Sequence, residues 1–244
     1  MNAIDTKRRQ FLSVGSAALA GVVLAPGLFL FGSAHGSESG QGASGRIRWG
    51  LLINANQCAT GCTDCVQACD RENRLTGGTG ETSSQWIRIM TLKDMHSGQT
   101  HALPMMCQHC EHPPCVDVCP TGASFQRADG IVLVDRHLCI GCRYCMMACP
   151  YKARSFVAHA LTDQNPEVPR GKGCVEGCTM CVQRIDQGQL PACVDACAAA
   201  GRNAIIFGDL NDPQSEISKR IASEVTRQVR ADLGLNPGVQ YQGI

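Results

Sequence analysis

Cys139-Ile-Gly-Cys142-Arg-Tyr-Cys145-Met-Met-Ala-Cys149-Pro150 is the stretch that decides the fold of this chain. Its spacing, C-x2-C-x2-C-x3-C-P, is a known binding run for a [4Fe–4S] cluster. The first three thiolates can surround one face of a cubane if the loop turns tightly, and Gly141 permits that turn because it has no Cβ. We expect Cys149 to stand at the start of the next helical segment, too far round to bind the same cluster. It would bind a neighbouring cluster, so the run predicts at least two of them.

Cysteine is abundant throughout the chain, with 17 among 244 residues, whereas aromatic residues make up only 5%. A core built on aromatic side chains is therefore not available, and disulfides or bound metal must hold the cysteine-rich segments. Most gaps between neighbouring cysteines are two to four residues, which suits thiolate ligation and is too short for most disulfide frameworks. Four groups of four result: Cys58, Cys62, Cys65 and Cys69; Cys107, Cys110, Cys115 and Cys119; Cys139, Cys142, Cys145 and Cys149; Cys178, Cys181, Cys193 and Cys197.

Zinc and haem are the other metal groups that cysteines could bind. Structural zinc favours two C-x2-C pairs separated by a longer loop, and only the last group resembles that pattern. No C-x-x-C is followed by His, so the chain is not a c-type cytochrome. His109 and His112 lie inside the second group, but that group lacks no cysteine, so we expect them beside the site or at the surface. Iron–sulfur clusters are the prediction.

Cys174 is the surplus thiol. Cys174-x3-Cys178-x2-Cys181 copies the unusual first gap of Cys58-x3-Cys62-x2-Cys65. Cys174 could therefore replace Cys178 as a ligand. The alternative is a thiol that lies near the cluster and does not bind it.

The N-terminus carries an export signal. Thr6-Lys7-Arg8-Arg9-Gln10-Phe11-Leu12 is a twin-arginine motif, an apolar run follows to Phe31, and Gly32-Ser33-Ala34 offers small residues for cleavage. Twin-arginine export carries folded, cofactor-loaded proteins, which would protect cluster thiols from pairing wrongly in an oxidising compartment. We expect a signal peptide over 1–34, a flexible linker over 35–46 and a periplasmic protein. An uncleaved anchor is the alternative, because about 20 apolar residues can span a bilayer.

The rest of the chain is interpreted as an α+β fold with short strands and helices. Strands are expected over 47–53, over 86–91 and up to about Met106, and a hairpin over 124–134 with an Asp129-Gly130 turn. A C-terminal helix should begin at Asp212-Pro213 and run to Asn236, with an apolar stripe every four residues, followed by a short tail over 239–244. The stripe residues are Ile217, Ile221, Val225 and Val229.

An internal repeat organises the cysteine-rich part. Cys119-Pro-Thr-Gly-Ala-Ser-Phe125 matches Cys149-Pro-Tyr-Lys-Ala-Arg-Ser-Phe156, and the segment from Cys197 to Phe207 is a looser third copy. Such repetition indicates a duplicated module. The prediction is a ferredoxin-type domain over 47–211, built of two interleaved modules with two clusters each, and a C-terminal helix and tail over 212–244.

No catalytic constellation stands out among the residues. The sequence contains no nucleophile elbow, phosphate loop or paired-carboxylate motif, which favours an electron relay over an enzyme with its own substrate site. The formal net charge of +1 gives no case for a nucleic-acid partner. A structural or sensing cluster protein without redox turnover is the alternative of another class.

A family resemblance adds to these inferences. The four groups, the Cys-Pro endings, the segment 191–197 and the segment 207–213 resemble the four-cluster electron-transfer subunits of the dimethyl sulfoxide reductase and polysulfide reductase type. The signal, the gap between Cys58 and Cys62, and the ending from Asn236 to Ile244 are similar to the periplasmic iron–sulfur subunits of Dsr-type membrane complexes, which are associated with sulfite reduction.

The resemblance implies a pseudo-twofold pairing of the groups, the first with the fourth and the second with the third. Four ligand sets follow: Cys58, Cys62, Cys65 with Cys197; Cys178, Cys181, Cys193 with Cys69; Cys107, Cys110, Cys115 with Cys149; Cys139, Cys142, Cys145 with Cys119. The longer first gap and Cys174 leave three clusters as an alternative to four.

The resemblance also implies partners, namely an integral membrane subunit that interacts with quinone on one side and a multihaem cytochrome c subunit on the other. The competing parent complex is a molybdopterin reductase such as polysulfide, tetrathionate or dimethyl sulfoxide reductase.

Overall fold

The computed structural model describes residues 21–25, 28–31, 43–75, 83–93, 95, 98, 100–162 and 164–244. The chain divides into two compact units, residues 1–39 and residues 40–244. In the first unit, β1 (Gly21–Ala25) pairs antiparallel with β2 (Leu28–Phe31). The twin-arginine motif, the cleavage residues and positions 35–42 of the linker lie outside the described residues, so export and cleavage stay predictions.

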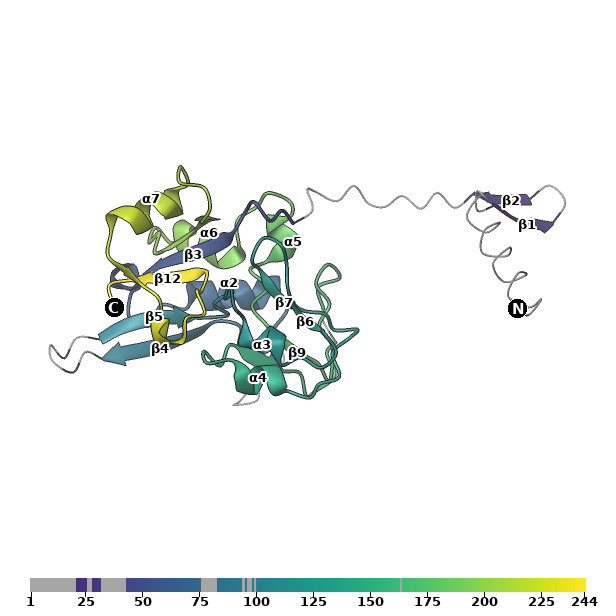
Figure 1. The fold of residues 1–244 in the computed structure, drawn as a ribbon, viewed down its shortest axis with the longest axis horizontal. Coiled ribbons are helices and arrows are strands. Elements are labelled where there is room, and N and C mark those ends of the chain that lie inside the picture. The colour runs from purple at the N-terminus through teal and green to yellow at the C-terminus, as the bar shows by residue number, and fades with distance from the viewer. Residues whose placement is uncertain are drawn as a thin grey trace, which may run out of the picture. The chain divides into compact units, whose positions relative to one another are not determined.

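The second unit contains a four-stranded sheet in the order β10-β3-β12-β11. Its two middle strands, β3 and β12, lie side by side in Figure 1. Its strands are β3 (Trp49–Asn54), β10 (Ile205–Asp209), β11 (Thr226–Arg227) and β12 (Val239–Gln242). β3 is central, antiparallel to β10 and parallel to β12. Leu51, Leu52 and Ile53 are all buried, as expected for a strand covered on both faces. The strand predicted over 47–53 is confirmed.

β12 corrects the expectation of a C-terminal tail. Val239 and Tyr241 are fully buried beside β3. The Tyr241 hydroxyl donates to the carbonyl of Pro104 at 3.1 Å and accepts from Gln108 Nε2 at 3.1 Å. The last residues of the chain are therefore part of the core sheet and hold it against the segment that enters the second cysteine group.

The second unit also contains three two-stranded sheets in its described part. They are β4 (Arg88–Lys93) with β5 (Thr100–Met105), β6 (Ser124–Gln126) with β7 (Val132–Val134), and β8 (Arg154–Phe156) with β9 (Val175–Gly177). The predicted Asp129-Gly130 turn joins β6 and β7, and Gly130 has a φ of 86°, which only glycine adopts at little cost.

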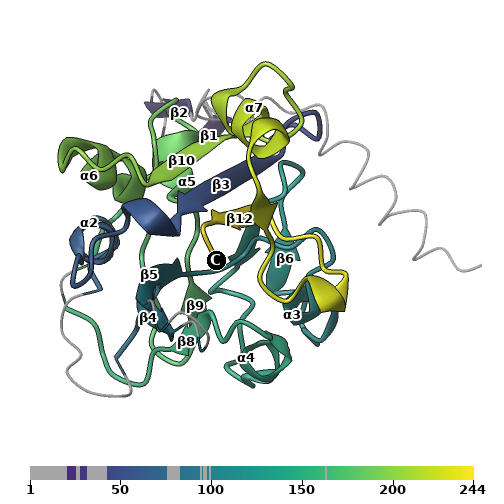
Figure 2. The same cartoon turned by 90° about the vertical axis from the view of Figure 1, so that its left-hand side faces the viewer.

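Short helices carry or follow the cysteines. They are α2 (Asp64–Glu72), α3 (Pro114–Asp117), α4 (Tyr144–Ala148), α5 (Val182–Ile185) and α6 (Ala192–Ala199), with 3-10 turns over Ala55–Gln57 and Ala231–Leu233. α2 packs against α6, and α3 against α4 (Figure 2). This places the first cysteine group beside the fourth and the second beside the third, the pairing that the family resemblance implied. Helices and strands are mixed along the chain, consistent with the α+β class.

Two helix predictions need correction. Cys149 does not begin a helix: it follows α4 as its C-terminal cap residue. The C-terminal helix, α7, is only Glu216–Ser223, and its N-cap is Ser215, whose hydroxyl accepts from the Ser218 N–H at 3.2 Å. Beyond Ser223 the backbone becomes extended, because Thr226 and Arg227 pair with β12. Sheet pairing thus outweighs the helical spacing of Val225, which is exposed, and Val229.

In the described part of the chain, no helix has both the length and the apolar character needed to cross a bilayer.

Candidate metal centres

The first and second cysteine quartets are built from α2, α5 and α6. We call them the outer pair because their cysteines come from the first and last cysteine groups of the sequence. The first quartet is Cys58, Cys62, Cys65 and Cys197, and these four residues line one small cavity together with Ile89, Pro104 and Ile205. The second quartet is Cys69, Cys178, Cys181 and Cys193, and these line another cavity with Trp86, Thr179 and Met180. The structure therefore brings together the thiols that the family resemblance implied for each of these two sites.

Arg202 is the charged group of the first quartet. Its Nη1 donates to Cys62 Sγ and, at 2.7 Å, to Asp64 Oδ2. Both Arg202 and Asp64 are partly exposed. The positive charge next to this quartet is therefore shared with a carboxylate and screened by solvent.

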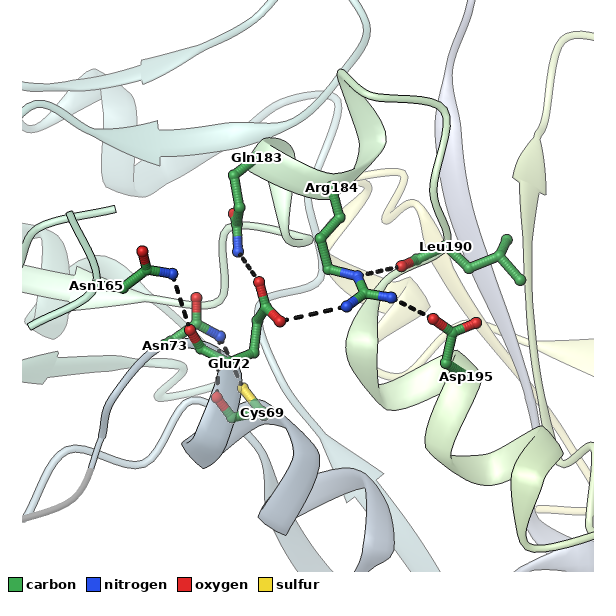
Figure 3. A network of polar contacts seen from close by, with 8 residues as sticks. All are labelled: Cys69, Glu72, Asn73, Asn165, Gln183, Arg184, Leu190 and Asp195. Carbon is green, nitrogen blue, oxygen red and sulfur yellow. Dashed lines mark hydrogen bonds and ion pairs between the residues drawn. The ribbon is translucent and has the colours of Figure 1, made fainter. Parts of the chain in front are cut away.

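A polar network fixes the second quartet in place (Figure 3). Glu72, at the end of α2, accepts from Gln183 Nε2 at 2.8 Å and from Arg184 Nη1 at 3.3 Å, and Arg184 also donates to Asp195 on α6. Asn73 donates from Nδ2 to Cys69 O at 3.0 Å and to Cys69 Sγ at 3.6 Å. α2 is thereby held to α5 and α6, which lie far from it in the sequence, around buried thiols.

The third and fourth quartets are built from α3, α4 and the hairpins β6–β7 and β8–β9. We call them the inner pair because their cysteines come from the two middle cysteine groups of the sequence. The third quartet is Cys107, Cys110, Cys115 and Cys149, and the fourth is Cys119, Cys139, Cys142 and Cys145. Burial raises the pKa of Cys110 to about 12, with the neighbouring Cys115 and Cys149 adding to the rise. Burial likewise raises the pKa of Cys145, and the neighbouring Cys115 and Cys139 add to the rise. For Cys119 and Cys142, membership of the fourth quartet stays a prediction.

Backbone N–H groups point at the sulfur atoms in each repeat copy. Ser124 N donates to Cys119 Sγ at 3.3 Å, Ala153 N to Cys149 Sγ at 3.5 Å, and Ala204 N to Cys197 Sγ at 3.3 Å. Each cysteine is followed by a strand of its copy, β6, β8 or β10. The repeat seen in the sequence is therefore also a repeat of structure, in which the same kind of donor serves the last cysteine of a group.

Successive quartets are neighbours and form a series. Cys65 of the first quartet and Cys69 of the second both lie on α2, and Cys107 of the third lines one cavity with Cys178 of the second. Cys115 of the third quartet and Cys145 of the fourth pack in one cluster. The second quartet is wholly buried, whereas Cys58 and Cys62 at one end and Cys142 at the other reach the surface.

The donor set of the quartets fits [4Fe–4S] clusters. Burial and the neighbouring Cys62 and Cys58 raise the pKa of Cys65 to about 12, so thiols grouped in this way ionise only if positive charge lies among them, which cluster iron supplies. Buried donors without a protein partner also face these cavities: among the described residues, nothing accepts from Trp86 Nε1, Thr179 Oγ1 or Arg154 Nη1. Sulfur atoms of a bound cluster would satisfy them.

His109 is a buried neutral residue. Its Nδ1 accepts from the Val132 N–H at 3.0 Å, which leaves the proton on Nε2. Burial, and then repulsion from Arg154, lowers the pKa of His109 to about 3. It lies beside the third quartet and orders β7, and that it is not a ligand stays a prediction.

Cys174 lies beside the third cysteine group. Its Sγ donates to the carbonyl of Arg136 at 3.3 Å, and the Cys139 carbonyl is 3.9 Å away. It does not line the cavity of Cys69, Cys178, Cys181 and Cys193. The geometry favours a thiol that is not a ligand.

Arg154 and Arg202 are the functional residues that the sequence did not single out. Arg154 Nη2 donates to Cys115 Sγ at 3.2 Å, and its side chain is buried between the inner quartets. The repeat contained a signal for Arg154. The residue after Cys-Pro-x-x-Ala is Ser124 in one copy and Arg154 in the other, so the second copy has a charge where the first has a hydroxyl.

Comparison with known proteins gives matches over most of the chain. Two family models, each described as a 4Fe-4S dicluster domain, match residues 57–123 and 99–209. The chain is 41% identical to the Hdr-like menaquinol oxidoreductase iron-sulfur subunit 1 of Archaeoglobus fulgidus, covering 96% of this chain and 97% of that protein.

Two further relatives carry the names of reductase subunits. A subunit of the tetrathionate reductase of Salmonella typhimurium is 35% identical over 99% of this chain and 90% of its own length. A putative dimethyl sulfoxide reductase iron-sulfur subunit of Halobacterium salinarum is 40% identical over 79% of this chain and 78% of its own length.

Proposed function

The chain belongs to the 4Fe-4S dicluster family and carries four [4Fe–4S] clusters, and from this premise we propose that it relays single electrons between two partner subunits of a membrane-associated redox complex. The observation that carries the proposal is the series of four cysteine quartets, in which each quartet adjoins the next. When bound, the clusters supply one-electron redox chemistry. The chain has the role of holding them in a row.

Each quartet is proposed as the ligand set of one cluster. The sets are Cys58, Cys62, Cys65, Cys197; Cys69, Cys178, Cys181, Cys193; Cys107, Cys110, Cys115, Cys149; and Cys119, Cys139, Cys142, Cys145. Burial of the second quartet excludes water from the middle of the series, while N–H donors and arginines stabilise thiolate charge. Variation in these local groups is what gives clusters different potentials.

The two ends of the series are proposed as the places where electrons enter and leave. Exposed apolar side chains of Leu138, Ile140, Tyr144 and Met147 surround the fourth quartet. Such patches mark contact surfaces, and we assign this one to an integral membrane subunit that interacts with quinone. The first quartet, flanked by the partly exposed Arg202 and Asp64, would then face a multihaem cytochrome c subunit.

The compartment belongs to the proposal as well. The twin-arginine motif supports export of the loaded chain to the periplasm, with attachment to the membrane through its partners. N-terminal sequencing of the exported protein tests cleavage: a mature chain that begins at His35 is expected, and one that begins before His35 would contradict cleavage at this point.

The parent complex is proposed to be of the Dsr type, serving sulfur metabolism. A relative named as a menaquinol oxidoreductase subunit, similar over nearly its whole length, supports a quinol-linked complex. The second candidate, the small subunit of a molybdopterin reductase, is supported by the relatives named as tetrathionate and dimethyl sulfoxide reductase subunits. Purification of the tagged full chain from membranes separates the two: a cytochrome c and a membrane subunit are expected, and a large molybdenum-containing subunit would favour the second candidate.

Redox titration of the purified complex, followed by electron paramagnetic resonance, tests the relay itself. We expect the clusters to take up electrons one at a time when a quinol analogue and a low-potential reductant are supplied. Clusters that are never reduced under these conditions would leave a structural or sensing role and overturn the relay.

A further inference from the structure

Arg154 is a buried cation at the boundary between the third and fourth quartets. It begins β8, directly after the repeat segment of Cys149, and only 8% of the residue is exposed. Its Nη2 donates to Cys115 Sγ at 3.2 Å, and its side chain lines one cavity with Cys107 and Cys178. The guanidinium therefore touches the third quartet directly and lies on the path from the second.

The charge of Arg154 is not cancelled by a carboxylate among the described residues. Glu176 lines the same cavity, but its two oxygens accept from Arg170 Nε at 2.9 Å and Arg170 Nη2 at 2.7 Å. Arg154 Nη1 is buried and has no hydrogen-bond partner in the described part of the chain. Arg136 adds a second cation to the wall of the cavity. The sulfur atoms are thus what compensates Arg154.

Both inner quartets lie next to this residue. Its guanidinium touches Cys115, and Cys115 packs in one cluster with Cys145 and with the partly buried Cys107. An arginine side chain keeps its charge at physiological pH. Cys115 and Cys107 belong to the third quartet, and Cys145 belongs to the fourth.

On the basis of the proposed relay, we propose that Arg154 is a potential-setting residue, which raises the midpoint potentials of the two inner clusters. Reduction adds one negative charge to a site, and a fixed positive charge in a medium of low dielectric constant stabilises that added charge. The hydrogen bond to Cys115 Sγ acts in the same direction, because donors to ligand sulfur favour the more negative state. Electrons would therefore be drawn toward the inner pair.

The test compares Arg154→Gln with the wild-type chain in the purified, anaerobically handled complex. Electron paramagnetic resonance during a redox titration gives the midpoint potential of each reduction step. In Arg154→Gln, two steps should shift downward, with the ratio of reduced to oxidised form at a fixed potential falling at least tenfold, about 59 mV for a one-electron couple. The other steps should stay in place.

Two variants control the interpretation. Arg202→Gln removes an arginine that touches Cys62 of the first quartet, and it should leave the two inner steps unchanged. Arg154→Lys keeps the charge, so the ratio of reduced to oxidised form in its two inner steps should fall less than tenfold at a fixed potential. This comparison holds even if Arg154→Gln loses iron. The proposal would be overturned if an iron-replete Arg154→Gln chain kept its two inner steps at the wild-type midpoint potentials. A tenfold or larger fall of the reduced-to-oxidised ratio in Arg154→Lys would also overturn it. A wild-type complex whose clusters are never reduced would instead refute the relay.

Discussion

Arg154 in the inner pair and Arg202 in the outer pair place the same side chain against the same kind of atom in two different surroundings. Each donates to a cysteine sulfur, Cys115 in one case and Cys62 in the other. Arg202 is partly exposed, and the nitrogen that donates to Cys62 also donates to Asp64. Arg154 is buried and has no carboxylate partner among the described residues. The contact alone therefore does not determine the electrostatic effect. Burial and the counter-charge determine it.

This difference gives the two halves of a duplicated fold separate properties. The repeat supplies each half with thiols, an N–H donor and a following strand. Substitution at single positions, such as Arg154 against Ser124, also distinguishes the two copies within the inner half. A series of clusters with unlike potentials can arise in this way without any change in architecture.

Loss of a ligand is expected to have the largest effect and to break the comparison outright. Cys115→Ser removes a thiol of the third quartet, and Cys65→Ser removes one of the first. Each variant should lose about four irons per chain, the content of one [4Fe–4S] cluster, in an iron and acid-labile sulfide assay. Cys115→Ser should be the less stable of the two, because it leaves Arg154 buried beside a weaker partner.

Cys174→Ser is the matched control for these ligand variants. Its thiol donates to a backbone carbonyl, which a serine hydroxyl also can do. The variant should retain the full iron content. A loss of iron comparable to that of Cys115→Ser would make Cys174 a ligand and contradict the quartets proposed here.

Gly141 and Gly61 sharpen the comparison at the level of the loops, since each directly precedes the second cysteine of its group. Both have positive φ, 71° and 79°. A Cβ at Gly141 would lie 2.2 Å from the carbonyl oxygen of Gly173, whereas no atom of the described residues lies within 4 Å of one at Gly61. Gly61→Ala should cost about 1–2 kcal/mol from backbone strain, and Gly141→Ala should cost about 1–3 kcal/mol more from crowding.

The midpoint temperature at which visible absorbance is lost measures these two variants. Gly141→Ala should show the larger fall from the wild-type value. Equal falls would mean that the inner loop can move away from Gly173 and that the two loops are equally tolerant.

Asp64→Asn should have the smallest effect and tests the cause of the difference between the arginines. Removal of this carboxylate leaves the Arg202 charge unpaired next to Cys62, so a step of the outer pair should shift upward. Because Arg202 is partly exposed, the ratio of reduced to oxidised form should change less than tenfold, which is a shift in midpoint potential of less than about 59 mV. A redox titration of this variant that shows a downward shift would contradict the role given to charge.

The sequence predicted the parts of the fold that depend on local chemistry. The cysteine spacing, the Asp129-Gly130 turn and the strand of Leu51 to Ile53 carry their signals within a few residues. The α7 boundary and β12 were predicted wrongly, because both depend on pairing between segments distant in the chain: β11 pairs with β12, and β12 with β3. No local periodicity in Val239 to Gln242 indicates that partner.

The site shows the same division. Spacing gave the four cysteine groups, and the family resemblance implied how they combine into quartets, but the sign and burial of the charge beside each quartet could not be predicted. Arg154 becomes distinctive only because Glu176 is occupied by Arg170, and that is a fact of tertiary packing.

The most direct test of the account is the iron and acid-labile sulfide content of the anaerobically purified full chain. Four filled quartets predict about sixteen iron and sixteen sulfide per chain, four of each for every [4Fe–4S] cluster. A protein that holds about twelve of each or fewer, the content of three such clusters or less, would contradict the claim that this chain spaces four clusters for electron transfer.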